Sequence, residues 1–228
     1  NGSGKTLLLK LIAGAIHPQS GQVNYSFIKG NDWDTLYQQR LEKIHFVPTD
    51  WLQAFLGGFD GLFYQQRYYT MDNIALPKVR DVFGDSLERS GNPISTESFD
   101  IAPLLDVHLT RLSNGQLRKV ILLRQLAKNI PHVLILDYPF DGLDAVSRRD
   151  LVNFIENISS KFGIQIIMTD HGEFVPAIMN RRLVLDHFRI LRSEHLTKRV
   201  TRKASPPVSI PFRSTDPIAV VEMQDLTI

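Results

Sequence analysis

The chain opens with Asn1-Gly2-Ser3-Gly4-Lys5-Thr6, which matches the end of the phosphate-binding pattern G-x-x-x-x-G-K-[ST]. The glycines of this pattern let the loop curl until successive backbone N–H groups face a phosphate. Lys5 supplies a positive charge for the β- and γ-phosphates, and the hydroxyl of Thr6 can ligate Mg²⁺. The leading glycine of the pattern would stand before Asn1, so we expect this chain to be a piece of a longer protein.

The order of apolar and polar segments after this loop predicts an α/β sheet domain. Residues 5–15 are mostly apolar and predict a buried helix that carries the loop at its N-terminus, where the helix dipole favours anions. A helical subdomain is expected over about 70–130, and the first strands of the domain are expected before Asn1. Further strands are predicted at 21–28, 44–47, 133–137, 164–169 and as a pair within 183–191, and further helices at 33–41, 115–129 and 147–162.

Composition, net charge and the length of apolar runs limit the classes of protein to which this chain can belong. With 228 residues and 43% hydrophobic content, the chain can bury a substantial core. A net charge of +2 is too small to indicate a nucleic-acid partner, and the lack of cysteine fits a reducing cytoplasm. No apolar run approaches the roughly 20 residues that cross a bilayer, so we expect no transmembrane segment.

A second motif is Leu112-Ser113-Asn114-Gly115-Gln116. The spacing Ser-x-x-Gln predicts a capping box at a helix start, with Ser113 as N-cap and Gln116 reaching back to it. A capped helix N-terminus that contains glycine is also an anion site. The two interpretations are compatible.

A third motif begins with the apolar run Val133-Leu134-Ile135-Leu136 and continues to Asp137. A buried strand that ends in aspartate places the carboxylate at the carboxyl edge of the sheet, beside the phosphate loop. There Asp137 can hold the Mg²⁺ of a bound nucleotide. The alternative is that Asp137 simply begins a turn.

In order and spacing these motifs resemble the ATP-binding cassette (ABC) ATPases, over nearly the whole chain. Residues 1–6 resemble the Walker A loop, 112–116 the signature motif, Asp137 the Walker B aspartate and 142–144 the D-loop. The resemblance implies a P-loop NTPase fold of ABC type and an ATP hydrolase with ATP and Mg²⁺ as cofactors. It further implies roles in nucleotide binding for the signature residues Ser113, Gly115 and Gln116, which would close over ATP held by a partner domain, and for Asp144 of the D-loop.

Within that family the chain looks like the soluble tandem cassette proteins of the molybdenum-transport and photorepair type. This similarity implies a first ABC domain at 1–194, a linker at 195–214 and the opening strand of a second ABC domain at 215–228. It also implies that either Gln65 or Gln66 lies in the Q-loop, near Mg²⁺ and the attacking water. The aromatic-rich segment 51–69 is a candidate docking surface for a membrane transport subunit, which would place a cytoplasmic protein at the inner face of the plasma membrane.

Two positions depart from the family pattern. Tyr138 stands where a glutamate normally polarises the attacking water, and a phenol with a pKa of about 10 is a poor base at neutral pH. Asp170 stands where the switch histidine is expected, and His171 follows it. Either the loop is shifted by one residue or the switch is lost. We therefore expect this half to bind Mg–ATP and to hydrolyse it slowly.

Three functions compete on this evidence. The first is an ATP-hydrolysing cassette that serves as transporter motor or clamp, and the second is a binding module that uses ATP mainly to hold two domains together. The third is a cassette acting on nucleic acid, for which the sequence offers a basic cluster in the linker: Lys198, Arg199, Arg202 and Lys203. A solvated linker is the favoured explanation of that cluster, so nucleic acid is the least favoured partner.

Overall fold

The computed structural model describes residues 2–30, 32–51, 55, 77–84, 99, 101–171, 175–196 and 221–227. Asn1, Gln65, Gln66 and the basic cluster of the linker lie outside these ranges. The helices are α1 (Lys5–Ile12), α2 (Trp33–Lys43), α5 (Val79–Phe83), α6 (Asn114–Lys128) and α7 (Ala145–Phe162), with short 3-10 turns at Ala102–Leu104 and Leu109–Arg111. The strands are β1 (Ser20–Tyr25), β2 (Ile44–Val47), β3 (Val133–Leu136), β4 (Gln165–Met168), β5 (Arg181–Asp186), β6 (Arg189–His195) and β7 (Val221–Thr227).

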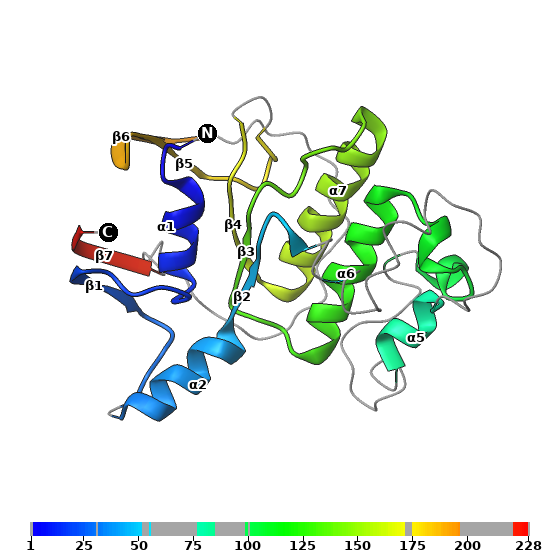
Figure 1. The fold of residues 1–228 in the computed structure, drawn as a ribbon, viewed down its shortest axis with the longest axis horizontal. Helices are drawn as coiled ribbons and strands as arrows, with labels where there is room; N and C mark the ends of the chain where they lie inside the picture. Colours follow the sequence, from blue (N-terminus) through cyan, green and yellow to red (C-terminus); the bar gives the residue numbers. More distant parts are fainter. Residues whose placement is uncertain are drawn as a thin grey trace.

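A parallel sheet in the order β2-β3-β4 forms the centre of the fold. Helix α1 covers one face of this sheet, and α6 and α7 cover the other (Figure 1). All four residues of β3 are buried, as is usual for a parallel strand covered on both sides. Val133 and Ile135 share a core cluster with α1, whereas Leu134 and Leu136 pack in the cluster of α6 and α7. This alternation confirms the predicted α/β architecture.

Helix boundaries follow from local capping. Helix α1 ends at Ile12, earlier than the 5–15 predicted, because Gly14 adopts the left-handed conformation (φ 67°) with which many helices end. Helix α7 begins at Ala145, two residues before the predicted start, because Asp144 caps it. Among the described residues, no helix is long and apolar enough to cross a membrane.

Strand β7 lies inside the range 215–228, where the sequence predicts a strand. It pairs antiparallel with β1, with Tyr25 opposite Val221 and Gln22 opposite Gln224 (Figure 1). The two strands form a sheet of their own, separate from the central one. The assignment of this strand to a second domain stays a prediction.

The pair of strands predicted within 183–191 is the β5–β6 hairpin, which extends further, from Arg181 to His195. Its turn is formed by His187 and Phe188, both with positive φ (45° and 61°). The backbone N–H of Phe188 donates to the carbonyl oxygen of Ser3 at 3.3 Å. The turn therefore lies against the loop that precedes α1, a contact that local sequence patterns do not indicate.

Candidate functional site

The loop before α1 has the backbone shape of an anion cradle. Gly2 and Gly4 both have positive φ (95° and 88°), a conformation that costs side-chain-bearing residues energy. Gly4 is the N-cap of α1, so the unpaired N–H groups of the first helical turn follow directly. The ammonium of Lys5 donates to Ser3 Oγ at 2.8 Å, within this loop. Cradle, helix dipole and ammonium together suit a phosphate.

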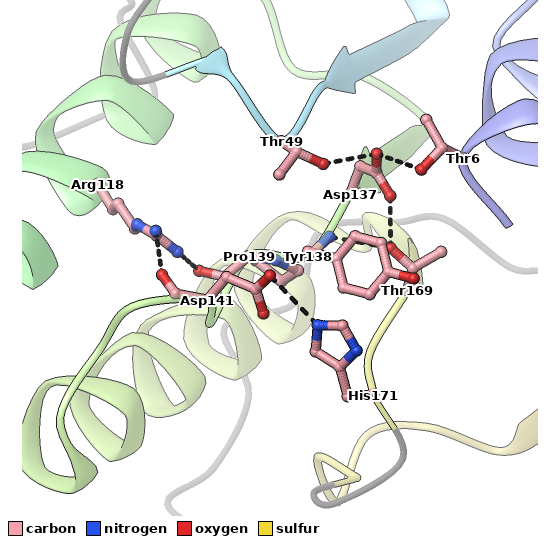
Figure 2. Close-up of polar contacts among 9 residues, drawn as sticks. All are labelled: Thr6, Thr49, Arg118, Asp137, Tyr138, Pro139, Asp141, Thr169 and His171. Carbon is pink, nitrogen blue, oxygen red and sulfur yellow. Dashed lines mark hydrogen bonds and ion pairs between the residues drawn. The ribbon is translucent and has the colours of Figure 1, made fainter. Parts of the chain in front are cut away.

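Asp137 is the centre of a hydrogen-bond cluster at the carboxyl edge of the sheet (Figure 2). It directly follows β3 and is only 1% exposed. Its Oδ2 accepts from the hydroxyls of Thr6 (2.9 Å) and Thr49 (2.7 Å), and its Oδ1 accepts from the hydroxyl of Thr169 (2.6 Å). The structure thus brings together Thr6 and Asp137, which are 131 residues apart in sequence.

Sequence reasoning missed Thr49 and Thr169. Thr49 follows β2 by one intervening residue, and Thr169 directly follows β4. The carboxyl ends of parallel neighbouring strands meet at one edge of a sheet, so both hydroxyls were placed near Asp137 by the strand order. That order was the available signal.

The chemistry of these donors fits Mg²⁺. A carboxylate and hydroxyls are hard oxygen ligands, and Mg²⁺ is usually held by one or two carboxylates together with substrate phosphates. The described residues contain no group of three or more His, Cys, Asp and Glu side chains that could hold a metal ion. A dedicated zinc-type cage is therefore not what this part of the chain offers, whereas Thr6 and Asp137 could hold a nucleotide-bound Mg²⁺.

Tyr138 has an unusual backbone conformation next to this cluster, with φ 49°. Its backbone N–H donates to Thr169 Oγ1 at 2.9 Å. Burial raises the pKa of the Tyr138 phenol, and the nearby carboxylates of Asp137, Asp141 and Asp170 raise it further. The phenol therefore stays protonated at neutral pH and cannot act as the missing base.

His171 lies over Tyr138. Their ring centroids are 4.6 Å apart with an interplanar angle of 28°, and His171 Nε2 lies 3.3 Å from Asp141 Oδ2 (Figure 2). Two residues, Asp170 and His171, follow Thr169. The structure places the side chain of His171 on the ring of Tyr138, which stands where the family has its glutamate. A role for Asp170 or His171 as the switch stays a prediction.

The capping box of the second motif is present. The N–H of Gln116 donates to Ser113 Oγ (3.1 Å), and the N–H of Ser113 donates to Gln116 Oε1 (2.9 Å). Gly115 is buried against α7, and a Cβ added to it would lie 3.0 Å from the Cβ of Ser147. This glycine therefore has a local reason in the packing of α6 on α7. The role of these residues at a partner's nucleotide stays a prediction.

Two further contacts hold the segment after β3 in place. The Asp144 carboxylate caps α7 by accepting from the N–H groups of Val146 and Ser147, both at 2.9 Å. The guanidinium of Arg118, on α6, donates to the carbonyl oxygens of Pro139 and Asp141 (Figure 2). Helix α6 is therefore tied to the turn that carries Tyr138.

The structure combines a parallel sheet, a glycine-rich anion cradle that leads into α1, and an aspartate at the end of β3. This combination defines a P-loop nucleotide-binding protein. Residues 1–141 match the family model described as ABC transporter. The chain belongs to this family and is an ABC-type ATP-binding domain, which confirms the family and the fold expected from its motifs.

Proteins of similar sequence are also named as ATP-binding proteins. The chain is 31% identical over 193 residues to the molybdate/tungstate import ATP-binding protein WtpC of Thermococcus kodakarensis, covering 81% of the chain and 53% of that protein. It is 32% identical over 189 residues to the putative ABC transporter ATP-binding protein TTE0246 of Caldanaerobacter subterraneus subsp. tengcongensis, covering 82% and 73%. The chain thus spans about half the length of WtpC.

Solved structures agree on the fold. The structure of cbiO1 from Clostridium perfringens, part of the ABC transporter complex cbiONQ, has a TM-score of 0.61 and 25% identity and covers 86% of the chain and 74% of its own. The cassette MJ0796 bound to ADP and Pi has a TM-score of 0.56 at 22% identity and covers 86% of the chain and 82% of its own. At that identity the second likeness shows the fold alone.

Proposed function

We propose that this chain binds Mg–ATP through Lys5, Thr6 and Asp137 and hydrolyses it slowly, as one half of a tandem ABC protein. The observation that carries the proposal is the 2.9 Å hydrogen bond between Thr6 and Asp137, because it joins the phosphate loop to the carboxyl end of β3. In a site assembled from these two elements, Thr6 and Asp137 would hold Mg²⁺, and the ion would supply positive charge for the nucleotide phosphates.

Each residue has a distinct part in binding. The backbone N–H groups of the loop and of the first turn of α1 would hold the phosphate oxygens, and Lys5 would add a point charge beside them. Thr6 and Asp137 would hold Mg²⁺, which neutralises charge on the phosphates when it is bound. Asp137 is buried, so its charge favours a cation more strongly than an exposed carboxylate would.

Slow hydrolysis follows from the residue next to Asp137. A positioned general base contributes about 10²–10⁴ to rate, whereas charge neutralisation and positioning do not depend on it. The pKa of Tyr138 is raised by burial and by three carboxylates, which makes proton removal by this phenol still less favourable than usual. We infer that this domain binds Mg–ATP tightly but hydrolyses ATP much more slowly than a site with a positioned base would.

The assembly around this half is part of the proposal. Relatives such as WtpC are named as import ATP-binding proteins. By analogy with them, this chain would drive import together with a membrane transport subunit, as a protein on the cytoplasmic side. A second ABC domain that follows the linker would supply the partner surface for Ser113, Gly115 and Gln116. The alternative is an ATP-gated clamp, in which the nucleotide holds the two domains together with little turnover, and the protonated Tyr138 favours it for this half.

The experiment is a base-restoring substitution. In the full-length protein, with any second cassette disabled at its own Walker A lysine, Tyr138→Glu is compared with Tyr138→Phe. We expect Tyr138→Glu to raise ATP turnover by about 10²-fold, while Tyr138→Phe leaves it unchanged and both variants keep the wild-type Kd for Mg–ATP. Flat turnover in Tyr138→Glu at unchanged affinity would show that the residue at 138 does not limit hydrolysis.

A further inference from the structure

The turn of the β5–β6 hairpin has a backbone conformation that its residues disfavour. Asp186 and Arg189 pair across the hairpin, so His187 and Phe188 form a two-residue turn. Both have positive φ (45° and 61°), as the central residues of a type I′ turn do, and glycine and asparagine are the usual residues there. A bulky side chain at positive φ is an outlier, and such strain concentrates at functional sites. The conformation of this turn therefore calls for a reason outside the hairpin.

The strained turn lies against the phosphate-binding loop, beside the start of α1 (Figure 1). The N–H of Phe188 donates to the carbonyl oxygen of Ser3 at 3.3 Å. A Cβ added to Gly4 would lie 2.7 Å from Cδ1 of Phe188 and 3.3 Å from its Cα. Phe188 thus fills the space that a side chain at Gly4 would need, although it remains 62% exposed. Its main chain and its ring contact two consecutive residues of the loop.

The hydrogen bond to Ser3 fixes the direction of one peptide group of the loop. The carbonyl of Ser3 and the N–H of Gly4 belong to the same planar trans peptide, so they point in opposite directions. Because the Ser3 carbonyl faces the hairpin, the Gly4 N–H points away from it. A phosphate held by the loop needs such N–H groups, whereas the reversed peptide would present a carbonyl oxygen and repel the anion.

We propose that Phe188 is a positioning residue for nucleotide binding, which braces the phosphate loop in its anion-binding conformation. This rests on the proposed function, namely that the loop binds Mg–ATP. The N–H of Phe188 holds the Ser3 carbonyl, and its ring holds Gly4 from the side that a side chain would occupy. Without the ring, the loop would spend part of its time with this peptide turned. The apparent Kd would then rise in inverse proportion to the fraction of competent loop.

The test compares nucleotide affinity with stability in the full-length protein, with any second cassette disabled at its own Walker A lysine. Phe188→Gly keeps the N–H, relaxes the turn and removes the ring. We expect the urea midpoint to stay or rise, because glycine tolerates positive φ. The Kd for Mg–ATP should rise about tenfold, as for a loop that is competent about a tenth of the time. Phe188→Tyr keeps the ring and should bind within about threefold of wild type.

His187→Gly is the matched control. His187 has the other positive φ of the turn, its side chain is 91% exposed, and its Nδ1 lies 2.9 Å from Asp186 Oδ2. The substitution therefore relaxes the same turn and leaves the ring of Phe188 in place, so the Kd for Mg–ATP should stay within about threefold of wild type. Inorganic tripolyphosphate with Mg²⁺ is the second ligand. It has no base, so a brace on the loop predicts the same fold loss for it in Phe188→Gly as for ATP.

The outcomes separate the two proposals. If wild type binds neither Mg–ATP nor Mg–tripolyphosphate, the proposed function itself is wrong. If wild type binds both ligands and Phe188→Gly binds them equally well, the brace is overturned. It is also overturned if Phe188→Gly loses affinity and stability together, as a residue that only supports folding would. A loss confined to ATP contradicts it too, because the ring would then act on the nucleoside and not on the loop.

Discussion

The ring of His171 stacks on the ring of Tyr138, with centroids 4.6 Å apart, and His171 Nε2 lies 3.3 Å from Asp141 Oδ2. His171, which directly follows the departure at Asp170, is therefore adjacent in space to the departure at Tyr138. The phenol at the position of the missing base supports one face of the imidazole, and the Asp141 carboxylate orients one of its nitrogens.

We predict that His171 supports the residual turnover of this half. An oriented imidazole is a general base that this cluster offers beside the phenol of Tyr138. His171→Ala should lower single-turnover ATP hydrolysis by about tenfold or more and leave the Kd for Mg–ATP within about twofold. Asp141→Asn, which removes the charge that faces Nε2, should give a smaller loss. Hydrolysis that is unchanged in His171→Ala would reduce the stack to packing alone.

The second prediction concerns the contact between α6 and the turn after β3. Arg118 is 8% exposed and donates to two backbone carbonyl oxygens, so its removal leaves buried acceptors unpaired. Arg118→Met should lower the free energy of unfolding by about 2–3 kcal/mol, measured by urea denaturation. Arg149→Met, an exposed arginine on α7, is the matched control and should change it by less than about 0.5 kcal/mol. Equal effects of the two variants would mean that Arg118 does not anchor the turn.

A third prediction concerns pH and stability. Burial lowers the pKa of His45, and a hydrogen bond with Asn129 offsets this only in part; burial also lowers the pKa of His132, with a contribution from Lys43. In the unfolded chain both imidazoles take up protons near pH 6.5, before they do so in the folded protein. The stability that they contribute is therefore complete above about pH 6.5 and is lost as the pH falls below it.

Urea unfolding at several pH values from 7.5 to 5 checks this prediction. His45→Phe, which keeps a ring on β2 but cannot titrate, should flatten the decline in the free energy of unfolding, and the double variant with His132→Phe should flatten it further. A decline as steep in the double variant as in wild type would assign the effect to other groups.

Local patterns were sufficient for those parts of the site that one segment determines by itself. The cradle needs glycines at positions 2 and 4, and the capping box needs Ser113 and Gln116 three residues apart, so both could be read from the sequence. The placement of Asp137 required one more step, namely that a buried strand must end at the sheet edge beside the loop.

The remaining features depend on which segments meet, and periodicity does not encode this. The pairing of β7 with β1 joins segments about 200 residues apart, and the contact of Phe188 with Ser3 depends on where a hairpin turn lies. A threonine after a short apolar strand has no signature of its own, so Thr49 could be placed beside Asp137 only from the strand order β2-β3-β4. A shift by one residue after Thr169 also leaves no periodic signature, so the sequence alone could not show that the His171 ring stacks on Tyr138.

The most direct test of the account is the Mg²⁺ dependence of ATP binding in the full-length protein, measured by calorimetry for wild type, Lys5→Ala and Asp137→Asn. Wild type should bind ATP more tightly with Mg²⁺ than with EDTA. Lys5→Ala should weaken binding under both conditions by about tenfold or more, because it removes a charge from the phosphates. Asp137→Asn should abolish the difference between Mg²⁺ and EDTA. Binding by both folded variants that equals wild type, with the Mg²⁺ dependence intact, would contradict a nucleotide site built on Lys5, Thr6 and Asp137.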